Sequence, residues 1–172
     1  MKPENFIIDV DGVLTTGQFY YSDKGKILKV FGKDDADALN LLKDKINIYF
    51  VSGDKRGFDI SKRRVNDMGF EISLVSTVKR IEWIKQNYNQ SKTIYMGDGI
   101  FDHYVFDEVF YSIAPSNAHI FAKNSCDFET LSSGGYGAVS EACLHILDKF
   151  FEPYDPKKTL DKNKKFSGSW KT

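Results

Sequence analysis

Short apolar segments alternate with helical segments along most of the chain, and this alternation restricts the fold more than any other feature. The predicted strands, short and mostly apolar or β-branched, are residues 6–10, 47–53, 72–76, 93–98, 111–114 and 126–130. The predicted helices, with apolar residues three or four positions apart, are residues 35–45, 57–69, 79–88, 100–109, 117–124 and 139–151. Alternating strands and helices indicate a parallel sheet with helices on both faces. The predicted fold class is therefore α/β, with a Rossmann-like three-layer parallel sheet.

Two segments depart from this alternation. Residues 18–31 alternate polar and apolar side chains around the turn sequence SDKG, which predicts a β-hairpin. Residues 153–172 are rich in Lys, Asp, Pro and Ser, so we expect a tail without regular structure in an isolated subunit, with aromatic side chains free to dock on a neighbour. The 172 residues fit one domain, which we place at residues 1–152.

Charge and apolar content narrow the possible partners and location. The chain carries 24 Lys and Arg against 24 Asp and Glu, so no basic excess supports a nucleic-acid or membrane-surface partner. No apolar signal core opens the sequence, and no apolar run approaches the ~20 residues of a membrane span. We therefore expect a cytoplasmic protein, in which Cys126 and Cys143 are free thiols.

Acidic residues follow the predicted strands at the ends where ligands bind. Asp9 and Asp11 close the first strand in IIDVDGVLTTG, and Asp98 closes a later one, with Asp102 one helical turn beyond it. Ligands of such sheets bind beyond the carboxyl ends of the strands, so these carboxylates are expected to share one pocket. Several carboxylates in one pocket need a cation between them, and Mg²⁺ suits an open site with oxygen ligands. The alternative at each position is an ordinary turn or helix-surface charge.

Three further residues at strand ends suit a phosphoryl group. Lys79 follows one predicted strand and adds a fixed positive charge, while Ser52 and the amides near Gly53 add neutral donors at the end of another. Positive charge, donors and Mg²⁺ together are typical of phosphoryl transfer. An aspartate in such a site can act as the nucleophile, and a second acid can protonate the leaving oxygen. Lys79 as a surface lysine beside Arg80, and Ser52 as a simple strand-end hydroxyl, remain open alternatives.

Taken in order, DVDGVLTTG, VSG, Lys79 and GDGIFD resemble the motifs of the haloacid dehalogenase superfamily. The resemblance implies that Asp9 is the nucleophile and Asp11 the acid and base. It implies that Ser52 holds the phosphoryl group and that Lys79 pairs with it. It also implies that Asp98 binds Mg²⁺ together with Asp9 and the backbone carbonyl of Asp11. Asp102 would support the metal site or orient Lys79.

The spacing of these motifs and three further stretches of sequence resemble one subgroup of that superfamily. Only 42 residues separate Asp9 from Ser52 and 26 separate Ser52 from Lys79, so neither gap holds the cap domain common in that superfamily. Residues 5–150, with GQFYYSDKGKILKVF, SIAPSNAH and SSGGYGAVSEAC, resemble the 3-deoxy-octulosonate 8-phosphate and nonulosonate 9-phosphate phosphatases. That subgroup implies a capless homotetramer whose hairpins pack together, with a neighbouring subunit covering the site.

Three positions differ from the subgroup's usual pattern by losing a basic residue. Asp34, Asp54 and Tyr136 stand where that pattern has basic side chains, although nearby basic residues could compensate, namely Lys55, Arg56 and Arg64. The favoured function is a Mg²⁺-dependent phosphomonoesterase that acts on a phosphorylated sugar acid. The alternatives are a phosphatase for another small sugar phosphate, and a non-catalytic oligomeric subunit that keeps the fold.

Overall fold

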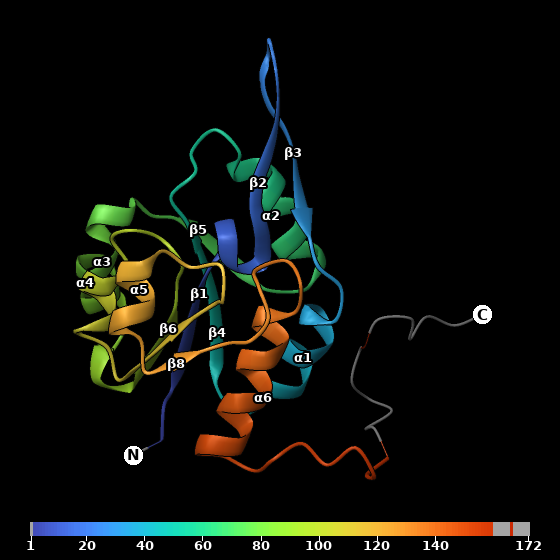
Figure 1. The fold of residues 1–172 in the computed structure, drawn as a ribbon. Helices are drawn as coiled ribbons and strands as arrows, with labels where there is room; N and C mark the ends of the chain where they lie inside the picture. The colour runs from blue at the N-terminus through green and yellow to red at the C-terminus, as the bar shows by residue number, and fades with distance from the viewer. Residues whose placement is uncertain (1, 160–165, 167–172) are drawn as a thin grey trace.

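A computed structural model describes residues 2–159 and 166, and a six-stranded parallel sheet lies at its centre (Figure 1). Its strands are β1 (Asn5–Asp9), β4 (Asn47–Ser52), β5 (Glu71–Leu74), β6 (Thr93–Met96), β7 (Tyr111–Ala114) and β8 (Phe128–Glu129). They lie in the order β5-β4-β1-β6-β7-β8, and every neighbouring pair is parallel. The chain therefore runs outward from β1 in one direction and then returns to continue on its other side.

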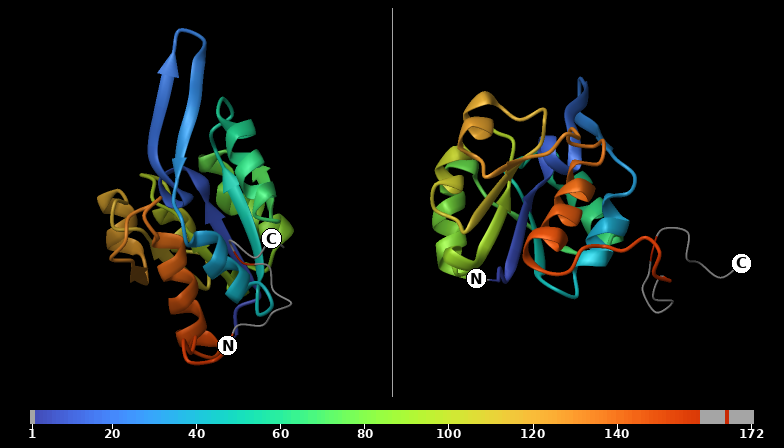
Figure 2. Two further views of the ribbon diagram at one scale, coloured as in Figure 1. Left: turned by 90° about the vertical axis from the view of Figure 1, so that its right-hand side faces the viewer. Right: turned by 60° about the horizontal axis from the view of Figure 1, so that its bottom comes forward.

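Helices cover both faces of this sheet (Figure 2). One face packs against α1 (Asp35–Leu42), α2 (Phe58–Asp67) and α6 (Ala138–Phe150), and the other against α3 (Arg80–Asn87), α4 (His103–Phe106) and α5 (Ile120–Ser125). Side chains alternate across a strand, so Ile8 enters the core of the first face and Ile7 that of the second. Both side chains are fully buried. The predicted three-layer α/β fold is confirmed.

The predicted elements are all present, with one clear difference in length. The helix predicted at residues 100–109 is only α4, His103–Phe106, because residues 97–102 form a loop tied down by Asp102, whose carboxylate accepts a hydrogen bond from the Gly99 N–H at 2.7 Å. Short helical turns, η1 (Val10–Leu14), η2 (Thr77–Lys79) and η3 (Gln90–Lys92), complete the connections. No helix in the described part of the chain is both long and apolar enough to cross a bilayer.

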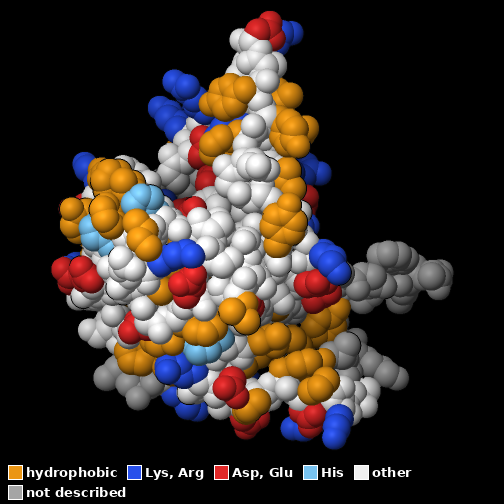
Figure 3. Space-filling model, viewed as in Figure 1, with side chains coloured by type: hydrophobic (Ala, Val, Ile, Leu, Met, Phe, Trp, Pro, Cys, Tyr) orange, Lys and Arg blue, Asp and Glu red, His pale blue; other side chains and the backbone are white. Residues whose placement is uncertain are grey.

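The predicted hairpin consists of β2 (Thr15–Ser22) and β3 (Gly25–Phe31), and it projects from the body of the molecule (Figures 1 and 2). Apolar side chains lie along its surface (Figure 3), and the exposed ones are Phe19, Tyr20, Tyr21, Ile27, Leu28 and Val30. Tyr20 pairs with Leu28 but Tyr21 pairs with Lys26, so Ile27 is an extra residue in β3. This β-bulge changes which side chains of β3 face the body.

The C-terminal segment leaves the sheet after α6. Residues 153–159 contain neither helix nor strand, in line with the expected tail. The rest of that prediction, for residues 160–165 and 167–172, lies outside the described residues. Cys126 and Cys143 are free thiols, as expected.

Candidate active site

The turn that follows β1 brings the first acidic pair to the carboxyl edge of the sheet. Asp9 is the last residue of β1, and its Oδ1 accepts a hydrogen bond from the Val10 N–H at 2.8 Å. The chain then turns through η1, where Gly12 has a φ of 85°. A Cβ at Gly12 would lie 1.9 Å from Asp98 Oδ2, so only glycine lets this turn approach that carboxylate. The turn after β1 thus lies directly against Asp98, in the loop that follows β6.

Three carboxylates meet at this point. Asp9, Asp98 and Asp102 each offer an oxygen atom, and these atoms lie within 4.8 Å of one another. Burial raises the pKa of Asp98 to about 8, with a further contribution from the charges of Asp9 and Asp102. Burial also raises the pKa of Asp9 to about 6, although the nearby Arg80 opposes the rise. Crowded, poorly solvated carboxylates of this kind suit a hard divalent cation with oxygen ligands.

A buried arginine partly balances these charges. Arg80 is 1% exposed, and its Nη1 lies 2.9 Å from Asp9 Oδ2 and 3.6 Å from Asp102 Oδ1. Nη1 also donates to the Tyr95 hydroxyl at 2.6 Å, and that hydroxyl donates to Asp102 Oδ1 at 2.8 Å. Nε and Nη2 have no hydrogen-bond partner among the described residues. The guanidinium therefore holds two carboxylates and keeps free donors for a further oxygen ligand.

The structure does not bring Lys79, the predicted cation, into this cluster. Lys79 is exposed and does not line the cavity, whereas Arg80 does. The physical reason is the helical turn: η2 ends at Lys79 and α3 begins at Arg80, and successive residues there point about 100° apart. Arg80, one residue beyond Lys79, is thus the cation that lies beside Asp9 and Asp102.

Asp102 is held within the cluster by hydrogen bonds from the surrounding protein. Its carboxylate accepts hydrogen bonds from Tyr95 and from the Gly99 N–H, and its side chain is 1% exposed. It therefore fixes the loop after β6 and the position of Arg80, rather than that of Lys79.

Asn117 joins two further loops near this cluster. Its Nδ2 donates to the Gly12 carbonyl at 2.9 Å, and its Oδ1 accepts from the Gly134 N–H.

Ser52 and Gly53 lie at the end of β4, beside Asp11. Ser52 is fully buried, and its hydroxyl donates to Asp11 Oδ2 at 3.0 Å and accepts from the Asp54 N–H at 3.1 Å. Gly53 lines the cavity opposite Thr77, whose Oγ1 would lie 2.7 Å from a Cβ on that glycine. Ser52 thus lies behind the cavity wall in this structure, while Gly53 and Thr77 form the wall.

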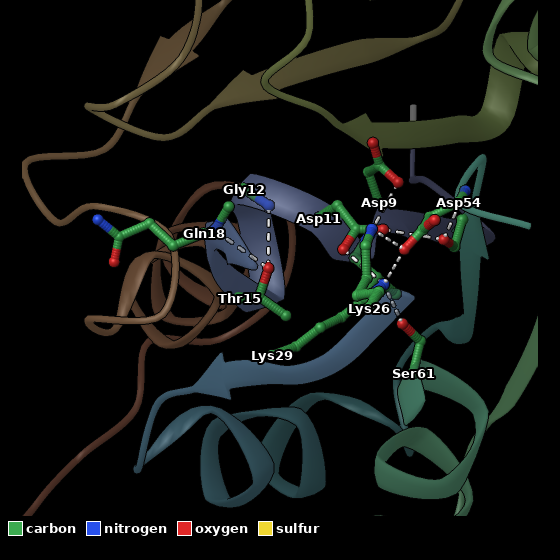
Figure 4. A network of polar contacts seen from close by, with 12 residues as sticks. Asp9, Asp11, Gly12, Thr15, Gln18, Lys26, Lys29, Asp54 and Ser61 are labelled. Atoms are coloured by element: carbon green, nitrogen blue, oxygen red, sulfur yellow. Dashed lines mark hydrogen bonds and ion pairs between the residues drawn. The ribbon is translucent and has the colours of Figure 1, made fainter. Parts of the chain in front are cut away.

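Two lysines of the hairpin, which were not predicted as site residues, pair with acidic residues of the site (Figure 4). Lys29 Nζ lies 2.6 Å from Asp11 Oδ1 and 2.9 Å from Asp54 Oδ2, and Lys26 pairs with the same Asp54 oxygen. Lys26 Nζ also lies 3.3 Å from the centre of the Phe19 ring. Burial alone would raise the pKa of Asp54, but the bonds from the two lysines outweigh it and lower the pKa to about 2.

These groups enclose a cavity of about 400 Å³. Its lining residues are Asp9, Asp11, Gly17, Phe19, Lys26, Gly53, Asp54, Thr77, Arg80, Asp98, Gly99 and Asp102. Of the three positions that lose a basic residue, only Asp54 lies at the cavity, and there it pairs with the hairpin lysines. Asp34 and Tyr136 are exposed, and none of the three suggested compensating residues lines the cavity.

Comparisons with known proteins find similar sequences and structures among sugar-acid phosphate phosphatases. No protein-family model matches the chain. A curated relative from Haemophilus influenzae, 3-deoxy-D-manno-octulosonate 8-phosphate phosphatase KdsC, is 33% identical over 147 residues, which are 82% of this chain and 81% of that protein.

Solved structures agree with that similarity. The cobalt-bound deoxy-D-mannose-octulosonate 8-phosphate phosphatase of H. influenzae has a TM-score of 0.75 and 32% identity, covering 86% of this chain and 88% of its own. The 3-deoxy-D-manno-octulosonate 8-phosphate phosphatase of Moraxella catarrhalis, in complex with magnesium, phosphate and KDO, has a TM-score of 0.73 and 28% identity, covering 85% and 86%.

Proposed function

Because the chain belongs to the haloacid dehalogenase superfamily, in the group resembling 3-deoxy-D-manno-octulosonate 8-phosphate phosphatases, we propose that it hydrolyses a phosphorylated sugar acid with Mg²⁺ as cofactor. The chain is a phosphatase that acts on phosphoric monoesters. Its substrate is 3-deoxy-octulosonate 8-phosphate or a nonulosonate 9-phosphate. The observation that carries this proposal is the convergence of Asp9, Asp98 and Asp102 at the carboxyl edge of the sheet.

Asp9 is the nucleophile in this proposal. One Oδ atom forms a bond to phosphorus while the bond from phosphorus to the ester oxygen breaks, which gives an aspartyl-phosphate. Asp11, in its protonated form, donates its proton to the departing sugar oxygen. Asp11 then takes a proton from water, whose oxygen attacks phosphorus and releases phosphate, so that both carboxyl groups return to their starting states. The position of Asp9 beside Arg80, at 2.9 Å, supports its role.

The chain's own residues suit both the ion and the phosphoryl group. Asp9, Asp98 and the backbone carbonyl of Asp11 would hold Mg²⁺, with Asp102 supporting them. The ion would neutralise charge on the transferred phosphoryl group. Arg80 takes the place that Lys79 held in the sequence-based proposal, because its unpartnered Nε and Nη2 are donors suited to phosphoryl oxygens. The amides near Gly53 add neutral donors at the cavity wall, and Ser52 holds the phosphoryl group once its hydroxyl turns from Asp11.

The assembly we propose is a homotetramer formed through the hairpins. The exposed apolar side chains of β2 and β3 support it, because a projecting hairpin with such a surface gains free energy by packing on copies of itself. A neighbouring subunit would then cover a cavity over which the described residues form no cap domain. A cytoplasmic location remains a prediction from the sequence.

The test is a substrate screen with a nucleophile variant. Phosphate release is measured from 3-deoxy-octulosonate 8-phosphate, a nonulosonate 9-phosphate and ordinary aldose phosphates, with Mg²⁺ and with a chelator. We expect the sugar-acid phosphates to have the highest kcat/KM, chelation to abolish turnover, and Asp9→Asn to lower kcat at least ~10⁴-fold. A higher kcat/KM for aldose phosphates would contradict the proposed sugar-acid substrate. Turnover without metal would contradict the proposed mechanism.

A further inference from the structure

Lys29 is a buried cation that the proposed mechanism leaves without a role. Its side chain is fully buried, although it belongs to β3 of the projecting hairpin. Its Nζ lies 2.6 Å from Asp11 Oδ1, 2.9 Å from Asp54 Oδ2 and 2.8 Å from Ser61 Oγ, to which it donates a hydrogen bond (Figure 4). The contact with Ser61 is a hydrogen bond, and the contacts with the two carboxylates are ion pairs.

These three partners come from three separate parts of the fold. Asp11 lies in η1, Asp54 follows β4, and Ser61 lies in α2. An ammonium held by three oxygens on three elements has little freedom to move, and removing it from water is tolerable only because it is paired. The Lys29 ammonium group is thus held in place, and the Asp11 carboxylate is paired with it.

The other side of Asp11 is held as well. Ser52 Oγ donates to Asp11 Oδ2 at 3.0 Å, while Lys29 pairs with Oδ1. Once the Ser52 hydroxyl turns to the phosphoryl group, as proposed above, the contact between Lys29 and Oδ1 still limits rotation of the carboxyl group about its Cβ–Cγ bond, and Oδ2 is free to carry the proton. Lys29 does not line the cavity, whereas its partners Asp11 and Asp54 do, so Lys29 acts on the cavity through these two carboxylates.

We propose that Lys29 is a positioning residue that holds the Asp11 carboxyl group in the orientation from which it protonates the leaving oxygen. This inference rests on the proposed function, in which Asp11 is the acid. It makes the base of the hairpin part of the active site, because β3 supplies the side chain that orients the proton donor. Loss of Lys29 would leave Asp9 able to attack but would misplace the proton donor.

This role predicts an effect that depends on the leaving group. A sugar alkoxide is a poor leaving group and needs its proton as the ester bond breaks, whereas 2,4-dinitrophenolate leaves without one. The value of kcat/KM reports the steps up to release of the alcohol or phenol, so it isolates this protonation from the later attack of water. A purely structural defect would lower kcat/KM equally for all esters.

The experiment measures kcat/KM for 2,4-dinitrophenyl, p-nitrophenyl and phenyl phosphate and for the best sugar phosphate, using Lys29→Met, Lys29→Arg and Asp11→Asn. For Lys29→Met we expect a loss of ~100-fold with phenyl phosphate and the sugar phosphate, and less than about 5-fold with the dinitrophenyl ester. Lys29→Arg, which keeps the charge, should fall between Lys29→Met and the wild type. Lys24→Met, in the exposed turn of the same hairpin, is the matched control and should match the wild type.

Two results would overturn the inference. Equal losses across the ester series would assign Lys29 to folding alone, and unchanged kcat/KM would show that Asp11 is held without it. Should Lys29→Met fail to fold, the leaving-group dependence of Lys29→Arg decides between these results. Asp11→Asn separates this inference from the proposed function: if that variant shows no leaving-group dependence, the acid role of Asp11 fails, whatever Lys29 does.

Discussion

Nη1 of Arg80 lies 2.9 Å from Oδ2 of Asp9, which joins the first residue of α3 to the last residue of β1. The contact forms at the centre of the sheet, where the strand order changes direction. It places the guanidinium of Arg80 at the cavity, which Lys26 also lines, and leaves its neighbour Lys79 exposed.

Arg80→Met is therefore expected to lower kcat/KM by about 10²–10³, because it removes a charged donor from the transferring phosphoryl group. Lys79→Met is the adjacent control and should stay within twofold of the wild type. Phosphate release from the best substrate measures both. A larger loss in Lys79→Met than in Arg80→Met would restore the assignment made from the sequence.

Gly12→Ala should disrupt the metal site, because a Cβ at this position would lie 1.9 Å from Asp98 Oδ2. We expect the affinity for Mg²⁺, measured by calorimetric titration, to fall ~10–100-fold. Gly69→Ala is a matched control, since Gly69 has a similar φ of 83° but no atom within 4 Å of its Cβ position. Both variants should lose about 1–2 kcal/mol of stability from the left-handed backbone. Equal Mg²⁺ affinities in the two variants would contradict the steric argument.

The affinity for Mg²⁺ should rise with pH. Without the ion, the pKa of Asp98 is about 8 and that of Asp9 about 6, so both are raised above their usual values. Protons therefore compete with the ion below pH 8, and binding releases them. Calorimetric titrations between about pH 6 and pH 9 should show affinity that increases to about pH 8 and then levels off. An affinity independent of pH would show that these carboxylates are already ionised.

Asp35 should make the protein less stable as the pH rises. It is 1% exposed in α1, and burial is the main reason that its pKa is raised from 3.8 to about 6. The folded state then binds the proton more tightly than the unfolded state, so this contribution to stability is complete below pH 3.8 and is lost as the pH rises through 6.

Asp35→Asn removes this titration, while its side-chain oxygen can still accept from the Ser140 N–H. Relative to the wild type, the variant should gain stability between about pH 4 and pH 7, by about 3 kcal/mol at most. Urea denaturation at several pH values measures the difference. A difference that stays constant with pH would show that Asp35 keeps its usual pKa in the folded protein.

Replacing both Tyr20 and Leu28 with Ser should dissociate the proposed tetramer. The two residues pair across the hairpin and are 54% and 56% exposed, so their loss should leave the fold of the subunit intact. Sedimentation velocity should show subunits of 19.7 kDa instead of a larger assembly. Lys24→Ser, at the tip of the hairpin, serves as the control. An unchanged mass would place the interface elsewhere.

The sequence contained enough to predict the sheet and the acidic centre. The apolar runs before Asp9 and Asp98 favoured buried parallel strands, and the carboxyl ends of such strands meet at one edge. The strand pattern therefore predicts that Asp9, Asp11, Asp98 and Asp102 share one pocket. All four line the cavity, but only Asp9, Asp98 and Asp102 have oxygen atoms within 4.8 Å of one another.

The basic side chains of the site could not be predicted in the same way, because each depends on a local irregularity. Whether Lys79 or Arg80 faces the site depends on the residue at which α3 begins, and such boundaries are uncertain by more than one residue in a sequence. Lys26 and Lys29 both reach Asp54 because the bulge at Ile27 shifts the alternation of β3. A regular strand would have pointed them to opposite faces.

The place of β1 between β4 and β6 also affects how activity is regained after denaturation. The strand that carries Asp9 has Ser52 at the end of one neighbour and Asp98 just beyond the end of the other, so a partly refolded chain that lacks either neighbour has no complete catalytic centre. Mg²⁺, held by these carboxylates as proposed above, would then bind only the finished sheet and not earlier intermediates. Recovery of turnover thus reports when the last of these long-range strand pairings forms. It should lag behind the return of the helical circular dichroism signal.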